Sequence, residues 1–392
     1  MKASIIIPSY NASERLYYNL LTLNNQDHVE QQFEVIIIDN GSTDDTKHML
    51  AKFQPQFPLT IVTINENKGI SHGRNQGILR ARGDILIFHD SDMLATRKYV
   101  KKHIEAHNDE DMVICGLYWR RVYSYYYHQF EDDQIQSFNK VAHLYSPIKK
   151  EEHGSIQLLT KEQIQDGSYQ HYQFELENSF VSQLRRNLKE YGSNLAGYYC
   201  PWKYFITNNA SVSRKKVFEV GLFDENFVRW GFEDYDLGFR LYRSGGRFSV
   251  REDIISIHQE HPRNYTMDMQ MVNADYVCKK YNHIHDIVVI LALTKMFDEK
   301  TKNDIVKDIH DLLKVKVKDC EEILTLFLQI IQNARKILNK QLKLEKIYKE
   351  MQDLIENRNL NQQLDQLHKK FKVEHFIRAF KYIIAFLNLN AE

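Results

Sequence analysis

The sequence is poor in the residues that characterise disordered, fibrous and disulfide-linked proteins. Its 392 residues include only 6 prolines and 15 glycines, which excludes a collagen-like repeat and a chain dominated by linkers. The four cysteines are scattered and form no CxxC pair: Cys115, Cys200, Cys278 and Cys320. A zinc site or a disulfide framework is therefore not expected, and the pattern is typical of reduced, buried thiols in a cytoplasmic protein.

The sequence also lacks an excess of charge and a long apolar run. Lysine plus arginine and aspartate plus glutamate each number 52, so no overall field attracts nucleic acid or an anionic membrane. No stretch reaches the roughly 18 apolar residues that span a bilayer, and no basic leader precedes an apolar region, so we expect no signal peptide. We therefore expect a cytoplasmic protein with no nucleic-acid partner and at most a peripheral membrane contact.

Four short apolar runs alternate with helical patterns in the first 90 residues. They are Ile5–Ile7, Phe33–Ile38, Leu59–Ile64 and Ile85–Phe88. Strands that alternate with helices predict an α/β fold with a mostly parallel, doubly wound sheet. Because no GxGxxG follows the first run and no GxxxxGK[ST] occurs, a dinucleotide-binding Rossmann domain and a P-loop are excluded.

Each of the four runs leads into polar residues of a different kind. In open α/β sheets, ligands gather outside the carboxyl ends of the strands. There the sequence offers an aromatic face, a carboxylate for a base edge, two cations for a diphosphate and an acidic triplet for a hard divalent cation. Each residue alone is more often an ordinary loop residue, but the combination predicts a nucleotide site. The set is Tyr10, Asp39, Lys68, Arg74 and Asp90-Ser91-Asp92.

Two later segments carry further candidate chemistry. Glu233 and Asp234 follow the Trp230-Gly231 turn and open a helical pattern. A helix N-terminus keeps a carboxylate ionised, and a positioned carboxylate can deprotonate an acceptor hydroxyl or thiol. Their alternative role is only to complement the helix dipole. A strand pattern then ends in His258, whose neutral imidazole suits Mn²⁺.

Four segments together resemble the family 2 glycosyltransferases of the GT-A fold. They are Ile5–Asn11, Ile38–Asp44, Asn67–Gly69 with Arg74-Asn75, and Asp90–Asp92, in the same order and spacing, within roughly residues 3–265. The resemblance implies that Pro8, Ser9, Tyr10 and Asp39 bind uridine, with Asn11 and Ser91 also in the nucleotide-sugar site. It also places Lys68 and Arg74 near the nucleotide or diphosphate, Asp90 at the ribose or the metal, and Asp92 as a ligand of Mn²⁺ or Mg²⁺.

The later segments resemble the acceptor and metal motifs of related enzymes. Trp-Gly-x-Glu-Asp is similar to the acceptor motif of galactosyl- and N-acetylgalactosaminyl-transferring GT-A enzymes, and His258-Gln-Glu to a segment of chondroitin-polymerase-like transferases. The resemblance implies that Trp230, Gly231 and Glu233 bind the acceptor and that Asp234 is the general base, although the two acids are interchangeable at this level. It makes His258 a metal ligand, with His261 as the alternative.

The remaining sequence suggests surrounding architecture. The aromatic stretch 118–130 suits contact with sugar or peptide, or an amphipathic helix packed on the sheet. Residues 131–175 are polar and form a candidate lid over the acceptor side. Beyond residue 265, apolar residues at helical spacing predict a helical appendage. We therefore expect a catalytic domain over 1–265, with a nucleotide-sugar half (1–110) and an acceptor half (111–265), and a helical domain over 266–392 that could form a homodimer.

These features predict a metal-dependent glycosyltransferase that transfers a sugar, with inversion, from a UDP-sugar to a glycan. A ribosomal peptide glycosylated on Cys or Ser is the alternative acceptor. A non-catalytic scaffold that binds sugar nucleotides is the alternative from another class. The sequence identifies neither the sugar nor the linkage.

Overall fold

The computed structural model describes residues 1–27, 32–146, 154–228, 230–263, 267–294, 296–338 and 360–389. They form two compact units. Unit 1 comprises Met1–Ala196 and Pro201–Asn273, and unit 2 comprises Gly197–Cys200 and Ala274–Glu392. The separate roles expected for residues 1–110, 111–265 and 266–392 stay a prediction.

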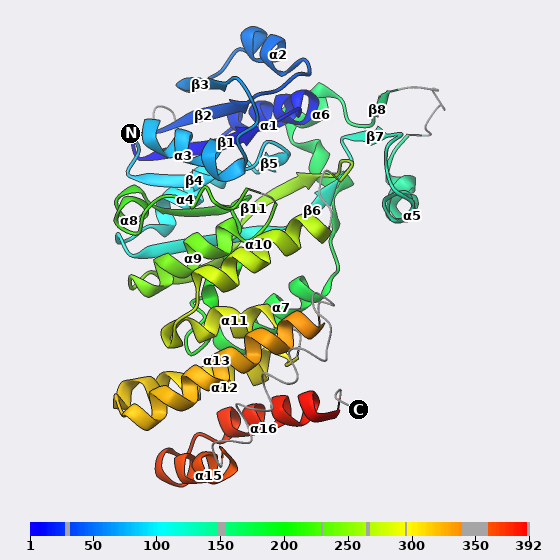
Figure 1. Cartoon of the computed structure of the whole chain (residues 1–392). Helices are drawn as coiled ribbons and strands as arrows, with labels where there is room; N and C mark the ends of the chain where they lie inside the picture. Colours follow the sequence, from blue (N-terminus) through cyan, green and yellow to red (C-terminus); the bar gives the residue numbers. More distant parts are fainter. Residues whose placement is uncertain are drawn as a thin grey trace. The chain divides into compact units, whose positions relative to one another are not determined.

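A mixed sheet organises unit 1 (Figure 1). Its strands are β1 (Ala3–Ser9), β2 (Phe33–Asn40), β3 (Leu59–Ile64), β4 (Ile85–Phe88), β5 (Met93–Ala95), β6 (Met112–Val122), β9 (Phe174–Glu175), β10 (Ala210–Ser213) and β11 (Arg247–Gln259). The order is β3-β2-β1-β4-β10-β6-β11-β5, with β9 beside β6. β1 to β4 are parallel, whereas β10 is antiparallel to both its neighbours. The four expected strands and the mostly parallel α/β sheet are confirmed.

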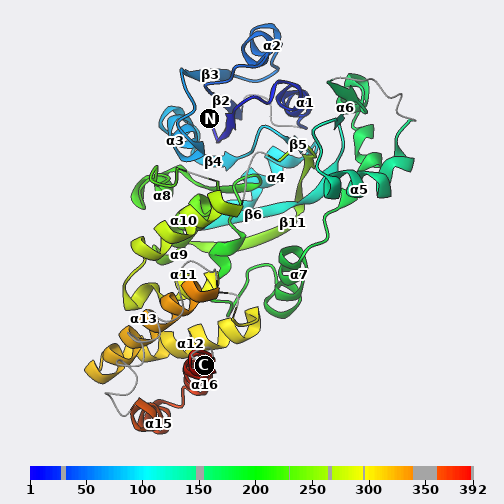
Figure 2. The ribbon, with the colours of Figure 1, turned by 45° about the vertical axis from the view of Figure 1, so that its right-hand side comes forward.

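Helices cover both faces of this sheet (Figure 2). On one face, α1 (Ser13–Asn24) and α4 (Tyr99–Ala106) pack on a core that includes Ile5 and Ile37. On the other face, α3 (Ile70–Arg80) lies close to the sheet, because a Cβ added at Gly77 would be 2.6 Å from Ile6 Cγ2. Any larger residue at position 77 would push α3 away from the strand ends that it flanks.

The remaining elements of unit 1 surround the sheet. They are α2 (Thr46–Lys52), β7 (Tyr125–Tyr127), α5 (Asp132–Val141), β8 (Ser155–Gln157), α6 (Lys161–Asp166), α7 (Ser179–Tyr191), α8 (Arg214–Glu219) and α9 (Glu233–Arg243), with 3₁₀ turns at Ala142–Leu144, Ser168–Tyr172 and Pro201–Tyr204. A helix over the aromatic stretch 118–130 is wrong. The stretch forms the end of β6 and the strand β7, which pairs with β8, because its bulky side chains pack on neighbouring strands and loops rather than along one helical face.

The strand that carries the histidines is irregular. β11 is parallel to β6 along most of its length, and the register shifts between Arg251 and Ile255 and again between Ile255 and Ile257. After these bulges β11 also pairs antiparallel with the short strand β5, where His258 lies opposite Met93. Strand β5 follows the acidic triplet directly, so this pairing brings the triplet to the end of β11.

Unit 2 is helical, as expected. Its helices are α11 (Ile287–Leu293), α12 (Glu299–Val315), α13 (Lys318–Leu338), α15 (Leu360–Phe371) and α16 (Glu374–Leu389), with a 3₁₀ turn at Ile284–Asp286; α10 (Met267–Lys280) leads into it from unit 1. The ring of Phe327 in α13 lies 4.9 Å from that of Phe376 and 5.2 Å from that of Phe380, both in α16. Within the described residues, no helix is long and apolar enough to span a bilayer.

Candidate active site

The carboxyl ends of β1 and β2 lie side by side, since Ser9 pairs with Asp39. The turn after β1 passes through Asn11, which has φ +49°. Its backbone N–H donates to Ser42 Oγ at 3.0 Å, and its Oδ1 accepts a hydrogen bond from Thr43 N–H at 2.8 Å. Asn11 thus ties the two strand ends together, and Pro8 is buried within β1. Both residues shape the predicted uridine site from within the protein.

Two buried polar atoms at these strand ends have no hydrogen-bond partner in the described structure. They are Ser9 Oγ and Asp39 Oδ2; the other oxygen of Asp39 accepts from Ser42 N–H at 3.0 Å. Leaving a buried polar atom unpaired costs about 1–3 kcal/mol, which a ligand that pairs with it would offset. The neighbouring Tyr10 is 44 % exposed, so its ring is accessible. These features suit a polar, planar ligand such as a nucleobase.

Lys68 lies in a loop that β2 holds in place. The side chain of Asn40 accepts from Lys68 N–H at 3.2 Å and donates to Gly69 O at 3.0 Å. The Lys68 ammonium is half exposed and 4.0 Å from a Glu66 carboxylate oxygen. Because exposed pairs of this kind are weak, the ammonium is available to an anion, and contact with a diphosphate stays a prediction.

Arg74 is buried between two carboxylates, and its expected place near the nucleotide or diphosphate stays a prediction. Its side chain is 2 % exposed, with Nη1 3.0 Å from Glu233 Oε1 and Nη2 3.0 Å from Asp90 Oδ1. Its guanidinium carbon lies 5.4 Å from the centre of the Phe223 ring. Two carboxylates therefore neutralise this cation inside the protein. Arg74 connects the acidic triplet to the Glu-Asp pair rather than presenting free charge to a phosphate.

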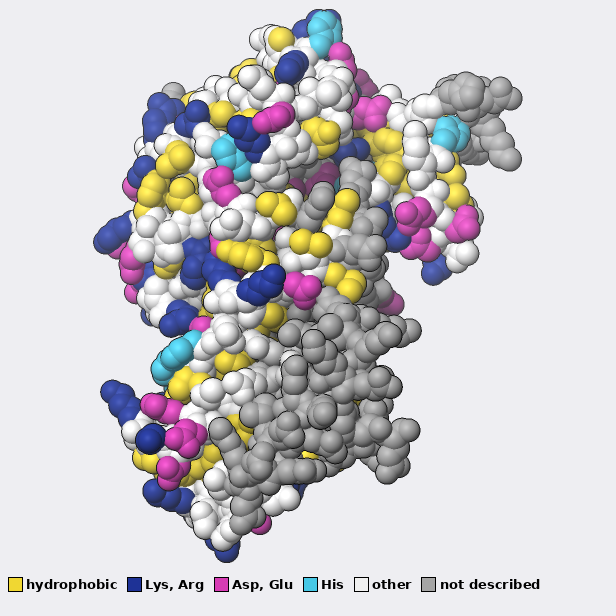
Figure 3. Space-filling view, viewed as in Figure 1, with side chains coloured by type: hydrophobic (Ala, Val, Ile, Leu, Met, Phe, Trp, Pro, Cys, Tyr) yellow, Lys and Arg dark blue, Asp and Glu magenta, His cyan; other side chains and the backbone are white. Residues whose placement is uncertain are grey.

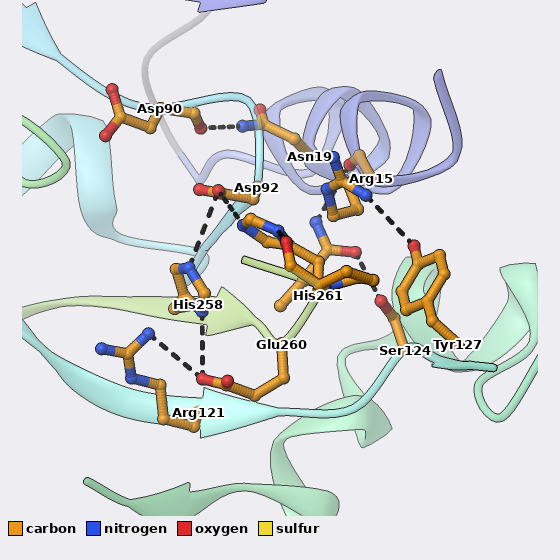
Figure 4. Close-up of polar contacts among 12 residues, drawn as sticks. Arg15, Asn19, Asp90, Asp92, Arg121, Ser124, Tyr127, His258, Glu260 and His261 are labelled. Atoms are coloured by element: carbon orange, nitrogen blue, oxygen red, sulfur yellow. Dashed lines mark hydrogen bonds and ion pairs between the residues drawn. The ribbon is translucent and has the colours of Figure 1, made fainter. Parts of the chain in front are cut away.

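Asp92, His258 and His261 converge on one point (Figure 4). Asp92 Oδ2 is 3.6 Å from His258 Nε2 and 3.0 Å from His261 Nε2. One ligand atom from each residue lies within 4.8 Å of the other two. Burial would raise the pKa of Asp92, but the adjacent imidazoles outweigh it and hold that pKa below its ordinary value. One carboxylate and two imidazoles are a donor set that fits Mn²⁺, so Asp92 and His258 meet as expected and His261 joins them.

Asp90 lies outside that convergent group. Its Oδ1 is bound to Arg74, and its backbone carbonyl accepts from Asn19 Nδ2 at 2.8 Å. Burial raises its pKa to about 6, against the opposing effect of Arg74. Ser91, between the two acids, is partly exposed. A role for Asp90 as a direct metal ligand therefore has no geometric support here, whereas contact with a ribose stays a prediction.

The Trp-Gly-x-Glu-Asp segment forms a strained turn into α9. Gly231 has φ +97°, and Phe232 has φ +70° although it is not a glycine; such backbone costs on the order of 1–3 kcal/mol and is concentrated at functional sites. The side chain of Asn273 donates to Gly231 O at 2.7 Å and supports the turn. Trp230 before it is 43 % exposed, so its ring is accessible to an acceptor.

The two acids of this segment have different environments. Glu233 is buried and bound to Arg74, with Oε2 lacking a partner in the described structure. Asp234 is partly exposed, and its Oδ1 accepts from Tyr235 N–H at 2.9 Å. Burial and the neighbouring Glu233 raise the pKa of Asp234 to about 8, against the effect of Arg74. A carboxylate with a pKa near the working pH is suited to general base catalysis, which favours Asp234 over Glu233.

Two residues to which the sequence assigned no role support these groups, although Glu260 belongs to the His258-Gln-Glu motif. Asn19 in α1 fixes the acidic triplet, and Glu260 contacts His258. Asn19 lies on the buried face of α1. A polar residue among apolar neighbours on that face was the signal in the sequence that could have indicated its role. Glu260 follows His258 by two residues, a spacing that places both on one side of an extended chain.

Charged side chains of both signs are interspersed on the face seen in Figure 3, in line with the zero formal net charge.

Comparison with known proteins places the chain among glycosyltransferases. The profile described as "Glycosyl transferase family 2" matches residues 4–179, and the one described as "N-terminal domain of galactosyltransferase" matches residues 190–265. The uncharacterized glycosyltransferase YfnE of Bacillus subtilis is 49 % identical over 333 residues, covering 84 % of this chain and 83 % of the relative.

More distant relatives carry specific names. The validoxylamine A glucosyltransferase of Streptomyces hygroscopicus subsp. limoneus is 26 % identical over 71 % of this chain and 56 % of the relative. The chondroitin synthase of Escherichia coli is 27 % identical over 66 % of this chain and 35 % of the relative, so the chain spans only part of these longer proteins. A crystal structure of Staphylococcus aureus TarS 1–349 with UDP has a TM-score of 0.47 at 15 % identity, over 97 % of this chain and 90 % of TarS 1–349. The two matched profiles and the close relative show that the chain is an enzyme of glycosyltransferase family 2.

Proposed function

We propose that the enzyme transfers a sugar from a UDP-sugar to a glycan, with inversion and with a divalent cation. The observation that carries this proposal is the convergence of Asp92, His258 and His261 at the carboxyl end of the sheet. Arg74 pairs with both Asp90 and Glu233, and Asp90 comes two residues before Asp92 in the acidic triplet. The proposed cation site for a diphosphate and the proposed carboxylates for an acceptor are thus linked through Arg74 and the triplet.

A single displacement at the anomeric carbon accounts for inversion. A bound Mn²⁺ or Mg²⁺ would offset the charge that develops on the leaving diphosphate, with Asp92, His258 and His261 as its ligands. Asp234 takes the proton from the acceptor hydroxyl as the new bond forms. Glu233, fixed by Arg74, orients the acceptor, and the Trp230 ring packs against it.

The donor site is proposed at the ends of β1 and β2. Ser9 Oγ and Asp39 Oδ2, which are buried and unpaired in the described structure, can bind the uracil edge, and the exposed ring of Tyr10 can stack on it. Lys68 approaches the diphosphate. We therefore propose a UDP-sugar as the donor, with its planar base at this position.

A glycan is the first choice of acceptor. Two relatives are named for the synthesis of the glycans hyaluronan and chondroitin, and a third is named for the glycosylation of another polymer, poly(ribitol-phosphate). A Cys or Ser side chain of a ribosomal peptide remains the alternative, because a thiol has an unperturbed pKa of about 8.5 and depends less on a base. We also propose a homodimer through the helices of unit 2, a cytoplasmic location and a lid within residues 131–175, of which 147–153 lie outside the described residues.

The experiment is UDP release from a panel of UDP-sugars, measured with Mn²⁺ and with EDTA, first without acceptor and then with glycan and peptide acceptors. Metal-dependent release with one donor and stimulation by a glycan are expected. Stimulation by a Cys peptide alone would favour the peptide alternative. The absence of release with every donor would favour a scaffold that binds sugar nucleotides without transferring them.

A further inference from the structure

The imidazole of His258 lies between two carboxylates that face different ring nitrogens. Nε2 is 3.6 Å from Asp92 Oδ2, and Nδ1 is 3.2 Å from Glu260 Oε1 (Figure 4). Glu260 does not belong to the convergent group of Asp92, His258 and His261 found among the described residues. It therefore touches a candidate ligand from the side opposite to the cation site.

Glu260 is itself held by β6. Its backbone N–H donates to Val122 O at 2.8 Å, and its Oε1 lies 3.2 Å from Arg121 Nη1. Arg121 pairs with His258 in the register of β6 and β11. The side chains of Arg121 and Glu260 are 15 % and 21 % exposed, so the ion pair is largely screened from water. The sheet thus fixes an Arg121–Glu260–His258 chain of contacts.

His261 provides an internal comparison. Its Nδ1 lies 2.8 Å from the backbone carbonyl oxygen of Pro262. The Asp92 carboxylate lies 3.0 Å from Nε2, so each ring nitrogen of His261 faces an oxygen that can accept its proton, and a cation bound at Nε2 would leave the proton on Nδ1. His258 shows the same arrangement, but Glu260 at 3.2 Å from Nδ1 is closer than Asp92 at 3.6 Å from Nε2. Here the acceptor at Nδ1 is a side chain that substitution can remove.

We propose that Glu260, held by Arg121, is a positioning residue that keeps the Nδ1–H tautomer of His258 and directs its Nε2 lone pair to the cation site. An acceptor on the distal nitrogen fixes the ring and raises the basicity of a metal-binding imidazole. The inference rests on the metal dependence proposed above and extends it to two residues outside the ligand set.

The first test measures the dissociation constant of Mn²⁺ from the full chain without sugar nucleotide, by electron paramagnetic resonance of free Mn²⁺. Glu260→Ala is expected to raise it about 10- to 100-fold, the range for loss of an outer partner of a ligand. Glu260→Gln is expected to recover part of this loss, because its amide oxygen still accepts from Nδ1–H. Arg121→Met should give a smaller increase. Glu252→Ala, at an exposed acid on β11, is the matched control and should change nothing.

The second test detects the tautomer directly in the metal-free chain. Nitrogen-15 NMR of histidine-labelled protein at a pH where imidazole is neutral is expected to show the Nδ1–H form of His258, assigned by its loss in His258→Gln. Glu260→Ala should increase the Nε2–H form. A general loss of packing would not move one tautomer selectively, and a variant that fails to fold is recognised by circular dichroism, in which case Arg121→Met carries the test.

The outcomes separate the two proposals. Tight Mn²⁺ binding by the wild type with an unchanged constant and tautomer in Glu260→Ala would overturn the role of Glu260. A wild type that binds no Mn²⁺ would instead refute the metal dependence itself.

Discussion

Replacing Arg74 by methionine tests the buried ion-pair framework most directly. The substitution keeps a long apolar stem but removes the charge between Glu233 and Asp90. Glu233 is 4 % exposed, so its carboxylate would remain buried without its cation. Breaking a buried pair in this way costs about 3–5 kcal/mol. Most of that cost is assigned to Glu233, because the Asp90 side chain is 27 % exposed and partly solvated.

Urea unfolding followed by tryptophan fluorescence suits this measurement. All three tryptophans, Trp119, Trp202 and Trp230, belong to unit 1, so the signal reports on the unit that contains Arg74. The free energy of unfolding should fall by about 3–5 kcal/mol in Arg74→Met with an unchanged m-value. Adding Glu233→Gln should restore part of it, because the stranded charge is then gone.

A matched control separates burial from charge. Lys215 pairs with Glu110 at 2.6 Å, but the two side chains are 73 % and 67 % exposed. Lys215→Met should therefore leave the free energy of unfolding almost unchanged. If Arg74→Met had an equally small effect, or if Glu233→Gln gave no recovery, the argument that Arg74 neutralises a buried carboxylate would be refuted.

Three further predictions concern turnover. Asp234→Asn should lower kcat by at least about 10²-fold, the usual contribution of a general base, while Glu233→Gln should chiefly raise KM for the acceptor; the reverse pattern would exchange their roles. With the pKa of Asp234 raised to about 8, the base is mostly protonated at neutral pH, so kcat/KM should rise about tenfold from pH 7 to pH 9, and a flat profile would contradict the assignment. Asp92→Asn should abolish stimulation by Mn²⁺ in the UDP-release assay but leave metal-free UDP binding, measured by calorimetry, within about twofold, since the proposed uridine contacts lie at Asp39; normal Mn²⁺ stimulation would exclude Asp92 as a ligand.

The parallel part of the sheet could be predicted from the sequence because its signal is local. Four apolar runs bounded by polar residues gave β1 to β4, and the order of motifs along the chain indicated the family. Asp92 and His258 could be paired only through the resemblance. Their meeting depends on the pairing of β5 with β11. Asp92 and His261, which flank these strands and contact each other, are 169 residues apart in the sequence.

Other features depend on tertiary contacts that no local pattern encodes. Arg74 and Glu233 are separated by 159 residues, so no local pattern could indicate the residue with which Arg74 pairs. The stretch 118–130 is rich in aromatic residues that suit either a helix or a strand, and pairing with β8, β9 and β11 decided for strands. The geometry of the site is thus set by strand pairing more than by the motifs themselves.

The bulges in β11 set the alternation of side chains that places His258 at the proposed metal site. Side chains along a strand alternate between its two faces, so a shift of one residue turns every later side chain to the other side. The irregularities between Arg251 and Ile257 come before His258 and determine which face its imidazole takes. Loss or gain of a single residue there would rotate His258 away from Asp92 while every ligand remained in the sequence. The proposed ligands can therefore meet only when this bulged segment keeps its length. An intact motif after an altered bulge does not ensure a working site.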